Sequence, residues 1–530
     1  MSNVSDESRV DVTAEVIPPP RKSRAMRVLG ILSAAAVLVV GGLFLYYMIS
    51  LHRAESHLAE VKAGLSFKLV PAKDLPTLWG PAPAEDDNAA PLYEQAITLA
   101  NRSFVWSEDS IRWEYDLLLE RVSEDDSLTS EEADRETAAL KQSLEKALLL
   151  SKEYKLLLVV WGLADAEDIA EYDDDAGEEV VPEIPPRDPV RVQAFLDSIA
   201  EVRRLRDQAV TRSGYRGNED WSGYMAVSVA SLNGMQALAR LTSLEVTVAA
   251  EQGRWDEAYG HLFQILAMVD HVDQQPTISG VCMTMRMRTE VCETMAGLFL
   301  KSLPSEPLRK KIEERLTLDA RAQFRRAIIS ECVGINGIFE DFLVGRDPRT
   351  NSLAPKSPVE PSFRPTMRLK TSLLEGQAAY LEFMDACVRL SAPPDDPSVV
   401  AECERIVDAF EPSVERIGGV GGKLAGGMAR AFSRERVTCD RAGALARMTC
   451  LGMRLAEWRQ TRHEFPATLG ELGETGRVPS DPFSKKPFHY RREGAGFVLW
   501  SVGPDGDDDG GMTEGDGDGD VVFCVPPRPR

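Results

Sequence analysis

The chain has 530 residues, 43% of them hydrophobic, and a formal net charge of −23. This length allows about two to four domains, and the apolar share is enough for a core of ordinary size. The charge excludes nucleic acid as an expected partner, because binding DNA requires basic patches that release counterions. Such acidity suits solubility, cations or basic partners.

An uncharged stretch near the N-terminus predicts a membrane-spanning helix. Val28–Leu51 contains 24 residues without a charge, enough to cross about 30 Å of hydrocarbon at about 1.5 Å per residue. Tyr46 and Tyr47 stand near its end, where amphipathic rings suit the lipid headgroup layer. A cleaved signal peptide is the alternative, but its apolar region usually has about 7–15 residues and a small-x-small cleavage site. The segment YYMISLHRAES offers no such site.

The charges around this stretch predict its orientation. Four cations precede it, whereas only His52 and Arg53 follow closely; the four are Arg21, Lys22, Arg24 and Arg27. The positive-inside rule therefore places residues 1–27 in the cytoplasm, with Met1–Pro20 as a polar, disordered tail. We expect residues 28–51 to be a signal anchor in the inner membrane, with the lipid bilayer as its partner and residues 52–530 in the periplasm or outside.

Residues 52–430 are expected to form an all-α extracytoplasmic domain of helical hairpins, because apolar residues recur at helical spacing and strand patterns are nearly absent before residue 485. Two proline-bearing regions, 65–83 and 344–366, are predicted to be loops. The corner AEQGRWDEAYGHL, with Gly253 as the turn, resembles one tetratricopeptide-type hairpin, and an ordinary αα-hairpin is the alternative. Predicted helices cover residues 89–100, 131–161, 188–210, 221–250, 255–269, 305–343, 368–391 and 398–410.

Two features of this domain permit more than one interpretation. Asp165–Glu183 carries ten acids and no base, a pattern typical of a solvated loop. Eight cysteines are present without a CxxC pair, which excludes zinc-ribbon and thioredoxin motifs. An oxidising compartment could pair some of them, and buried free thiols are the alternative.

The motifs of common enzymes are absent. The run GGVGGKLAGG at 418–427 lacks the glycine at 417 and the Ser or Thr at 424 of a phosphate-binding loop, and indicates a flexible linker. His463-Glu464 starts a zinc-protease motif, but position 467 is alanine. His261 and His271 are ten residues apart and face different directions on one helix, so we expect structural roles. The sequence indicates no catalytic residue and favours a non-enzymatic protein.

The organisation changes at residues 431–530. RAGALARMTCLGMRLAEWRQTRHEFP predicts a long amphipathic helix that Pro466 ends. Phe488–Arg491, Phe497–Val502 and Val521–Val525 are rich in aromatic and β-branched residues and predict a three-stranded antiparallel sheet, with a turn at Glu493-Gly494. The fold class is therefore mainly α, with an N-terminal transmembrane helix, an all-α body and a small C-terminal α+β module.

This module resembles the C-terminal half of the major pseudopilin of type II secretion. The shared features are a helix ending at an FP step, DPF…PFHY, a strand, and SVGPDG…GG…D before a last strand, over about 85 of 530 residues. The whole chain resembles single-pass bacterial membrane proteins that carry this tail. Pseudopilins, however, carry their membrane segment at the start of the same helix, whereas here about 390 residues lie between Leu51 and Arg441. The stretch VLGIL also lacks the glutamate of pilin subunits, which disfavours pilin-like polymerisation.

The resemblance implies a calcium ion in the last loop, held by carboxylates and main-chain carbonyls. The spacing of Asp505, Asp507, Asp509 and Gly510 independently matches the first half of a calcium loop, and Asp516 falls at the twelfth position. These four aspartates are the expected ligands, and Asp520 is a possible replacement for one of them. A solvated acidic tail is the alternative.

Two functions stay open at this stage. The first is a non-enzymatic envelope protein whose body presents a surface to protein partners and whose tail is a calcium-stabilised recognition module. The second is an envelope hydrolase with catalytic groups scattered through the body, which would require a deep polar pocket holding two or three ionisable groups within hydrogen-bond reach.

Overall fold

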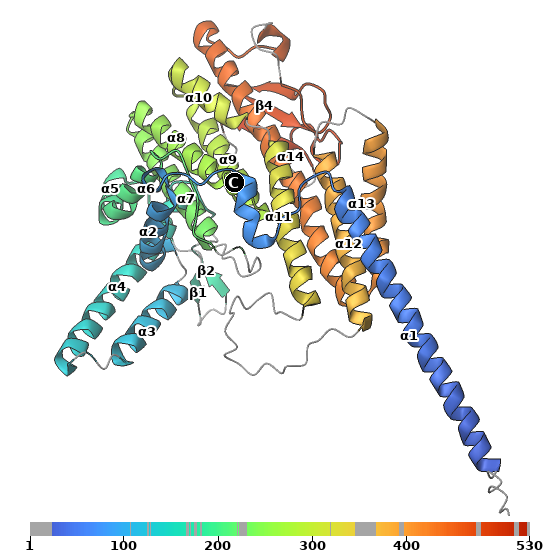
Figure 1. Ribbon diagram of the computed structural model, residues 1–530. Helices are drawn as coiled ribbons and strands as arrows, with labels where there is room; N and C mark the ends of the chain where they lie inside the picture. The colour runs from blue at the N-terminus through green and yellow to red at the C-terminus, as the bar shows by residue number, and fades with distance from the viewer. Residues whose placement is uncertain are drawn as a thin grey trace, which may run out of the picture.

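The protein is mainly helical, with a small three-stranded antiparallel sheet near the C-terminus, as the computed structural model shows (Figure 1). This confirms the expected fold class at that level. The expected tail Met1–Pro20 and nearly all of the loop 344–366 lie outside the described residues. The structure describes residues 24–526 except 106–107, 125–126, 128, 166–168, 170, 174–177, 181–182, 220, 222–229, 318–319, 345–366, 392–396, 473–478 and 513–518.

Helices account for most of the described chain. The α-helices are α1 (Arg24–Gly64), α2 (Ala90–Ala100), α3 (Glu108–Glu124), α4 (Ser130–Val160), α5 (Pro189–Ser198), α6 (Ala200–Ala209), α7 (Ala230–Glu251), α8 (Trp255–Val272), α9 (Ile278–Leu298), α10 (Glu306–Leu316), α11 (Ala320–Leu343), α12 (Met367–Leu390), α13 (Pro397–Ile417) and α14 (Gly419–Arg462). Short 3-10 or π segments are η1 (Ala72–Trp79), η2 (Glu85–Asp87), η3 (Asn101–Val105) and η6 (Leu469–Leu472). The strands are β1 (Glu171–Asp173), β2 (Glu178–Val180), β3 (His489–Glu493), β4 (Gly496–Ser501) and β5 (Val521–Val525).

Several predicted boundaries are wrong for a local reason. The helix predicted over 188–210 is two helices, because Ile199 leaves the helical conformation, at φ −114° and ψ 26°, and is buried. The helix predicted over 305–343 likewise divides into α10 and α11. The region 65–83 is not wholly a loop, since η1 buries Leu75 and Trp79. Apolar spacing predicts which residues face the core. It does not reveal a helix end when the residue at that end is itself apolar and buried, because the spacing then continues from one helix into the next.

The acidic run also differs in part from the expected solvated loop. Within it, β1 and β2 pair in antiparallel fashion, with Glu171 opposite Val180 and Asp173 opposite Glu178. The ladder is made by backbone groups, so a high density of acidic side chains does not by itself prevent pairing.

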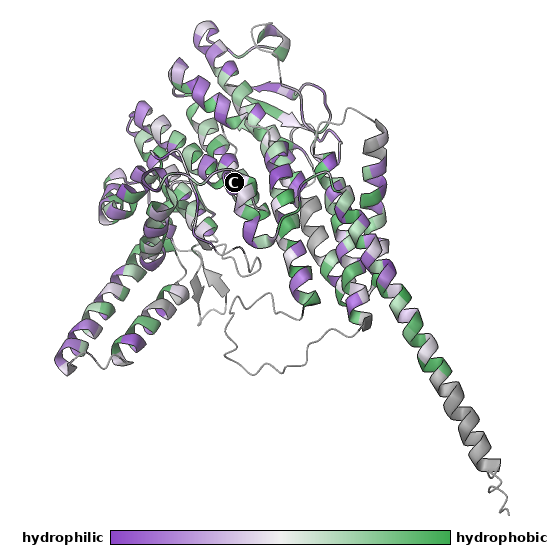
Figure 2. Cartoon of the chain, in the orientation of Figure 1, coloured by the Kyte–Doolittle hydropathy of each residue, from purple (hydrophilic) through white to green (hydrophobic). Residues whose placement is uncertain are grey.

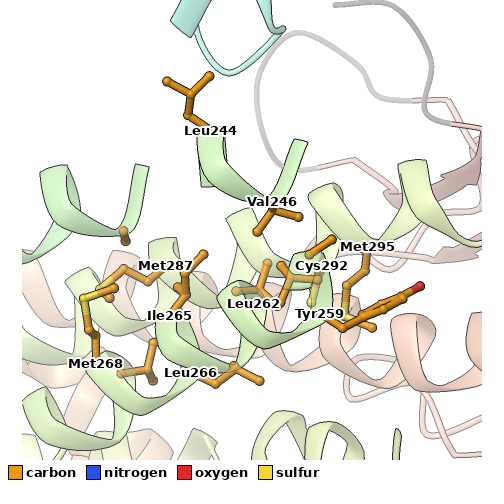
Figure 3. Close-up of a cluster of buried hydrophobic side chains, with 14 of the residues drawn as sticks. Leu244, Val246, Tyr259, Leu262, Ile265, Leu266, Met268, Met287, Cys292 and Met295 are labelled. Atoms are coloured by element: carbon orange, nitrogen blue, oxygen red, sulfur yellow. The ribbon is translucent and has the colours of Figure 1, made fainter. Parts of the chain in front are cut away.

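Two apolar cores lie side by side and share α14. The larger one joins α2, α4 to α10, the C-terminal part of α14 and the three-stranded sheet. Figure 3 shows its centre, where Leu262 of α8 lies beside Cys292 of α9 and Ile265 lies beside Met287. The second joins α11 to α13, the N-terminal part of α14, and Ala54 and Leu58 of α1. The predicted division of the chain at 430/431 falls inside α14.

The interpretation of residues 418–427 as a flexible linker is wrong. Gly418 and Gly419, both at φ 59°, form the turn between α13 and α14, and the rest of the run belongs to α14. A Cβ on Gly421 would lie 1.8 Å from the Ser372 carbonyl oxygen of α12. The glycines are therefore required for two helix backbones to touch, which is a packing role and not a hinge.

The predicted αα-hairpin is confirmed as a local structure. α7 and α8 pack together, and Gly253 at the corner has φ 72°, a conformation that glycine adopts without strain. A second pair, α3 and α4, extends from the body as an arm (Figure 1).

All eight cysteines are free thiols, so the buried-thiol alternative holds in this structure. The buried ones are Cys292, Cys332, Cys403, Cys439 and Cys450. Burial raises the pKa of the Cys439 thiol to about 12, with the nearby carboxylates of Asp440 and Glu435 acting in the same direction. These thiols therefore stay protonated at neutral pH.

The first helix leaves the body as a long stalk (Figure 1). Its C-terminal part packs on α12, and the described residues before that part, from Leu38 to Ile49, include many exposed apolar side chains (Figure 2). Within the described part of the chain, none of the helices combines the length and the apolarity needed to cross a membrane.

Candidate metal centre in the C-terminal module

The three-stranded sheet lies on α14 through its apolar face. The strand order is β3-β4-β5, with both neighbouring pairs antiparallel. Phe497, Leu499 and Phe523 alternate into the larger core, and a Cβ on Gly452 of α14 would lie 2.8 Å from the Phe523 ring. The turn between β3 and β4 falls at residues 494–495, one residue later than predicted, because Gly494 has the positive φ of 53°.

The acidic loop between β4 and β5 folds back over the other face of the sheet. His489 stacks on Trp500 with ring centroids 5.2 Å apart, and Arg491 lies over the same indole. Trp500 Nε1 donates to Asp508 Oδ1 at 2.8 Å, and His489 Nδ1 lies 3.3 Å from Asp508 Oδ2. The hydrogen bond from Trp500 is the main cause that lowers the pKa of Asp508. One carboxylate thus attaches the start of the loop to the sheet.

Asp520 closes the other end of the loop and is buried, with 1% of its surface exposed. Its Oδ2 accepts a hydrogen bond from the Gly511 N–H at 2.8 Å, whereas its buried Oδ1 has no hydrogen-bond partner in the part of the chain that the structure describes. Burial raises the pKa of Asp520; hydrogen bonds from the Gly511 and Asp509 N–H groups oppose this, and the charges of Asp509 and Asp508 add to it. The charges of two other aspartates therefore act on Asp520, whose Oδ1 has no partner among the described residues.

The structure brings only some of the predicted ligands together. Asp505 and Asp507 are exposed, and Asp505 Oδ1 accepts from the Asp507 N–H at 3.1 Å in a local turn. Asp509 is half-buried and close to Asp520, and Asp516 lies outside the described residues. Among the residues that the structure describes, no group of three or more His, Cys, Asp or Glu side chains has the arrangement of a metal site.

The donor set nevertheless fits a hard cation. A buried carboxylate oxygen without a hydrogen bond costs roughly 1–3 kcal/mol or more, and Ca²⁺ is bound by carboxylate and main-chain oxygens. Asp520 and Asp509 would hold such an ion, with Asp505, Asp507 and Asp516 as the further ligands that the sequence predicts. The ion would neutralise the repulsion between the carboxylates. The Gly510 carbonyl is already occupied, because Arg491 Nη1 donates to it at 3.1 Å.

Sequence reasoning missed two residues that build this site. Asp508 lies off the alternate-residue spacing of a calcium loop, yet it is the carboxylate that holds the loop on Trp500. Asp481, in the DPF step, is fully buried. Its Oδ1 accepts from the Ser501 hydroxyl at 2.6 Å and from the Phe483 N–H at 3.0 Å, and its Oδ2 accepts from the Ser484 hydroxyl at 2.7 Å. The DPF step was the available signal, because an Asx residue before proline often starts a turn.

Asp481 contrasts with Asp520 in the direction in which its pKa is shifted. Burial alone would raise the pKa of Asp481, but hydrogen bonds from Ser501, Phe483 and Ser484 outweigh it and lower the pKa below the usual value. Asp481 is therefore a structural anion that ties the DPF turn to β4.

The body contains a histidine in a polar contact, but its atoms are fully engaged. His271 Nδ1 lies 3.0 Å from the Tyr93 hydroxyl, and His271 Nε2 lies 3.0 Å from the Arg212 carbonyl oxygen. The carbonyl can only accept, so Nε2 carries the proton and Nδ1 accepts from Tyr93. Burial lowers the pKa of His271. Both ring nitrogens serve structural bonds, as the sequence analysis expects.

A buried ion pair joins α6 to α7. Arg206 is fully buried and donates to Glu245 Oε2 and to Thr242 Oγ1, the latter at 3.0 Å. Arg206 also donates to Asp207, and Arg203 Nε donates to Glu245 Oε1 at 2.6 Å. Burial alone would raise the pKa of Glu245, but Arg206 outweighs it and the net pKa is lowered. The pair is ionised and satisfied on both sides.

One surface hollow of about 400 Å³ lies between α4 and α5. Within it, Glu153 and Arg191 satisfy each other through two hydrogen bonds of 2.6 Å, and the Ser198 hydroxyl donates to the Phe195 carbonyl at 2.6 Å. The hollow is lined by Lys146, Leu149, Leu150, Glu153, Arg191, Ala194, Phe195 and Ser198. Its serine and its carboxylate are therefore each bonded to a neighbouring group and not to one another.

Comparison with known proteins adds no relative: no family model, no curated protein and no solved structure matches the chain.

Proposed function

We propose that the chain is a membrane-anchored, extracytoplasmic structural or interaction protein whose C-terminal module is stabilised by calcium. The observation that carries the metal proposal is Asp520, a buried aspartate with one oxygen that lacks a partner among the described residues and on which the charges of Asp509 and Asp508 act. A hard cation would satisfy this oxygen and offset the mutual repulsion. Its role would be to stabilise the loop that covers the sheet.

The membrane anchor is supported by the apolar side chains of α1. Nine of them between residues 38 and 49 are exposed, and they are Leu38, Val39, Val40, Leu43, Phe44, Leu45, Tyr46, Met48 and Ile49. Contiguous exposed apolar surface of this kind is typical of a membrane or protein contact. The four cations before residue 28 support the orientation with the body outside the cytoplasm.

The arrangement of the module is compatible with the pseudopilin-like resemblance. α14 is followed by a three-stranded antiparallel sheet, and the acidic loop joins its last two strands, which is the order that the resemblance implies. A relation to secretion or pilus-like machinery rests on this analogy. Protein partners in the cell envelope are the corresponding proposal, and the separate position of α1 disfavours polymerisation through α14.

The metal proposal is tested by thermal unfolding of the full chain in detergent. We expect millimolar Ca²⁺, compared with chelator, to raise the Tm; binding at a hundredfold excess over Kd stabilises by about 2.7 kcal/mol. Asp520→Asn should lose this response, and Glu493→Gln, which changes an exposed acid on β3, should keep it. An unchanged Tm at millimolar Ca²⁺ would remove the metal from the proposal.

The anchor is tested separately in cells. We expect the full chain in the membrane fraction after a carbonate wash, with residues 55–530 degraded by protease added to spheroplasts from outside. Recovery of the chain in the soluble fraction would contradict the anchor. Cleavage that occurs only after lysis would contradict the orientation.

A further inference from the structure

One end of the helical body lies where α1 leaves it. α11 ends there, α12 and α14 begin there, and α1 passes beside them as it extends away (Figure 1). Contacts between these helices show which residues share this end.

The positions of α11, α12 and α14 along their shared direction follow from two hydrogen bonds. Gln377 Nε2 of α12 donates to Asn336 Oδ1 of α11 at 2.7 Å, so these two residues lie at the same level. The two helices are antiparallel, so eight residues forward along α11 corresponds to eight residues back along α12. Val344 and Leu369 are therefore also level with each other, about 12 Å from that bond. Ser372 Oγ donates to the Gly418 carbonyl at 3.0 Å, which places the start of α14 within a turn of the same level.

The stalk reaches this level at the end of its apolar stretch. Lys370 Nζ lies 3.2 Å from Glu55 Oε1, and Arg389 Nη2 donates to the Gly64 carbonyl at 3.4 Å, so α1 and α12 run in parallel. The residues of α1 that are level with the helix ends are therefore those just before Glu55, where Val28–Leu51 ends.

Two exposed valines mark this end of the body. Val344, after α11, is 70% exposed, and Val420, in the first turn of α14, is 41% exposed. The exposed charges of Glu415 and Arg416 offset each other, and Lys423 adds one exposed cation. An apolar tip with a cation beside it suits the boundary between hydrocarbon and lipid phosphate.

We propose that this end of the body rests on the bilayer, with Val344 and Val420 inserted among the lipid headgroups and Lys423 at the phosphates. The inference rests on the proposed anchor, because α1 supplies the continuity between the valines and the membrane. The body would then stand at a set height and rotation on the membrane, since Ala54 and Leu58 of the stalk belong to its core.

The test is photo-crosslinking of the full chain in vesicles of phosphatidylethanolamine and phosphatidylglycerol. Val344, Val420, Leu45 and Val190 are replaced one at a time by p-benzoylphenylalanine, and lipid adducts are measured by mass spectrometry. Leu45 reports on the anchor itself. Val190 of α5 is the matched control, because it is 76% exposed and the helix α5 lies on the opposite side of the body from α1 (Figure 1).

We expect lipid adducts at Leu45, Val344 and Val420. The yield of adducts at Val344 and Val420 should be at least about tenfold the yield at Val190. A factor of ten corresponds to about 1.4 kcal/mol, which is the order of the free energy of burying a valine side chain. Adducts at Leu45 together with background labelling at Val344 and Val420 would overturn the inference and leave the anchor intact. Background labelling at Leu45 would overturn the anchor. Equal labelling at Val190 and the other valines would overturn the specific docking end.

Discussion

Buried charge is accommodated differently in the helical body and in the C-terminal module. In the α6–α7 pair, Arg206 and Glu245 are bonded to each other and to Thr242, Asp207 and Arg203. In the acidic loop, Asp520 is equally buried, but one of its oxygens has no partner among the residues that the structure describes. The first region is complete within the chain, whereas in the second the proposed ion would supply the partner that Asp520 lacks among the described residues. This difference is why the loop, and not the body, is the candidate site.

The largest effect is expected from breaking the completed pair. Arg206→Met leaves Glu245 buried with Arg203 as its remaining partner, and removing one partner of a buried ion pair costs about 3–5 kcal/mol. Urea unfolding of the full chain measures it. Arg204→Met is the control, because Arg204 pairs with Glu201 on the surface and its loss should leave stability unchanged. Equal free energies of unfolding for Arg206→Met and Arg204→Met would contradict the special role of the buried pair.

Asp481 provides a completed acid inside the module itself. Asp481→Ala removes the acceptor for Ser501, Phe483 and Ser484. The free energy of unfolding should fall by about 2–3 kcal/mol, and the sheet should unfold before the rest of the chain. Because the folded pKa of Asp481 is lowered, its contribution is complete above about pH 4 and is lost as pH falls through the folded pKa. Unfolding followed by Trp500 fluorescence from pH 6 to pH 2 should therefore show a steeper acid loss in the wild type than in the variant.

A smaller effect is expected where the loop is attached to the sheet. Trp500→Phe removes the indole N–H that donates to Asp508, which should cost about 1 kcal/mol. Hydrogen exchange of the amides at residues 503–511 should rise in the variant while exchange in α14 stays unchanged. Faster exchange in both would mean that Trp500 acts through the core and not through the loop.

The smallest effect has the opposite sign. In chelator at neutral pH, Asp520→Asn should stabilise the chain by up to about 1 kcal/mol, because it keeps an acceptor for Gly511 and removes an incompletely satisfied charge. The folded pKa of Asp520 is raised, so its ionisation lowers stability as pH rises from about 4 through that folded pKa. Thermal unfolding between pH 4 and pH 7 measures it. A variant that is less stable than the wild type in chelator would show that Asp520 is satisfied without a metal.

The sequence alone was sufficient for the elements whose pattern is local. Apolar spacing predicted α4 and α12 almost to the residue, and aromatic and β-branched runs predicted the three strands of the module. Gly253 predicted the corner of the α7–α8 hairpin because its positive φ is a local property. The acidic loop was likewise visible from its carboxylates, including Asp520.

Tertiary structure alone decided what depends on contacts between distant residues. The glycines at 418–427 have the composition of a linker, but their role is set by the contact of Gly421 with Ser372 of α12. Asp508 and Asp481 gain their importance from Trp500 and Ser501, and Arg206 from Glu245 on another helix. Hydrogen bonds and backbone contacts of this kind leave no periodicity in the chain, because periodicity reports only which side of an element is buried and not which partner it meets.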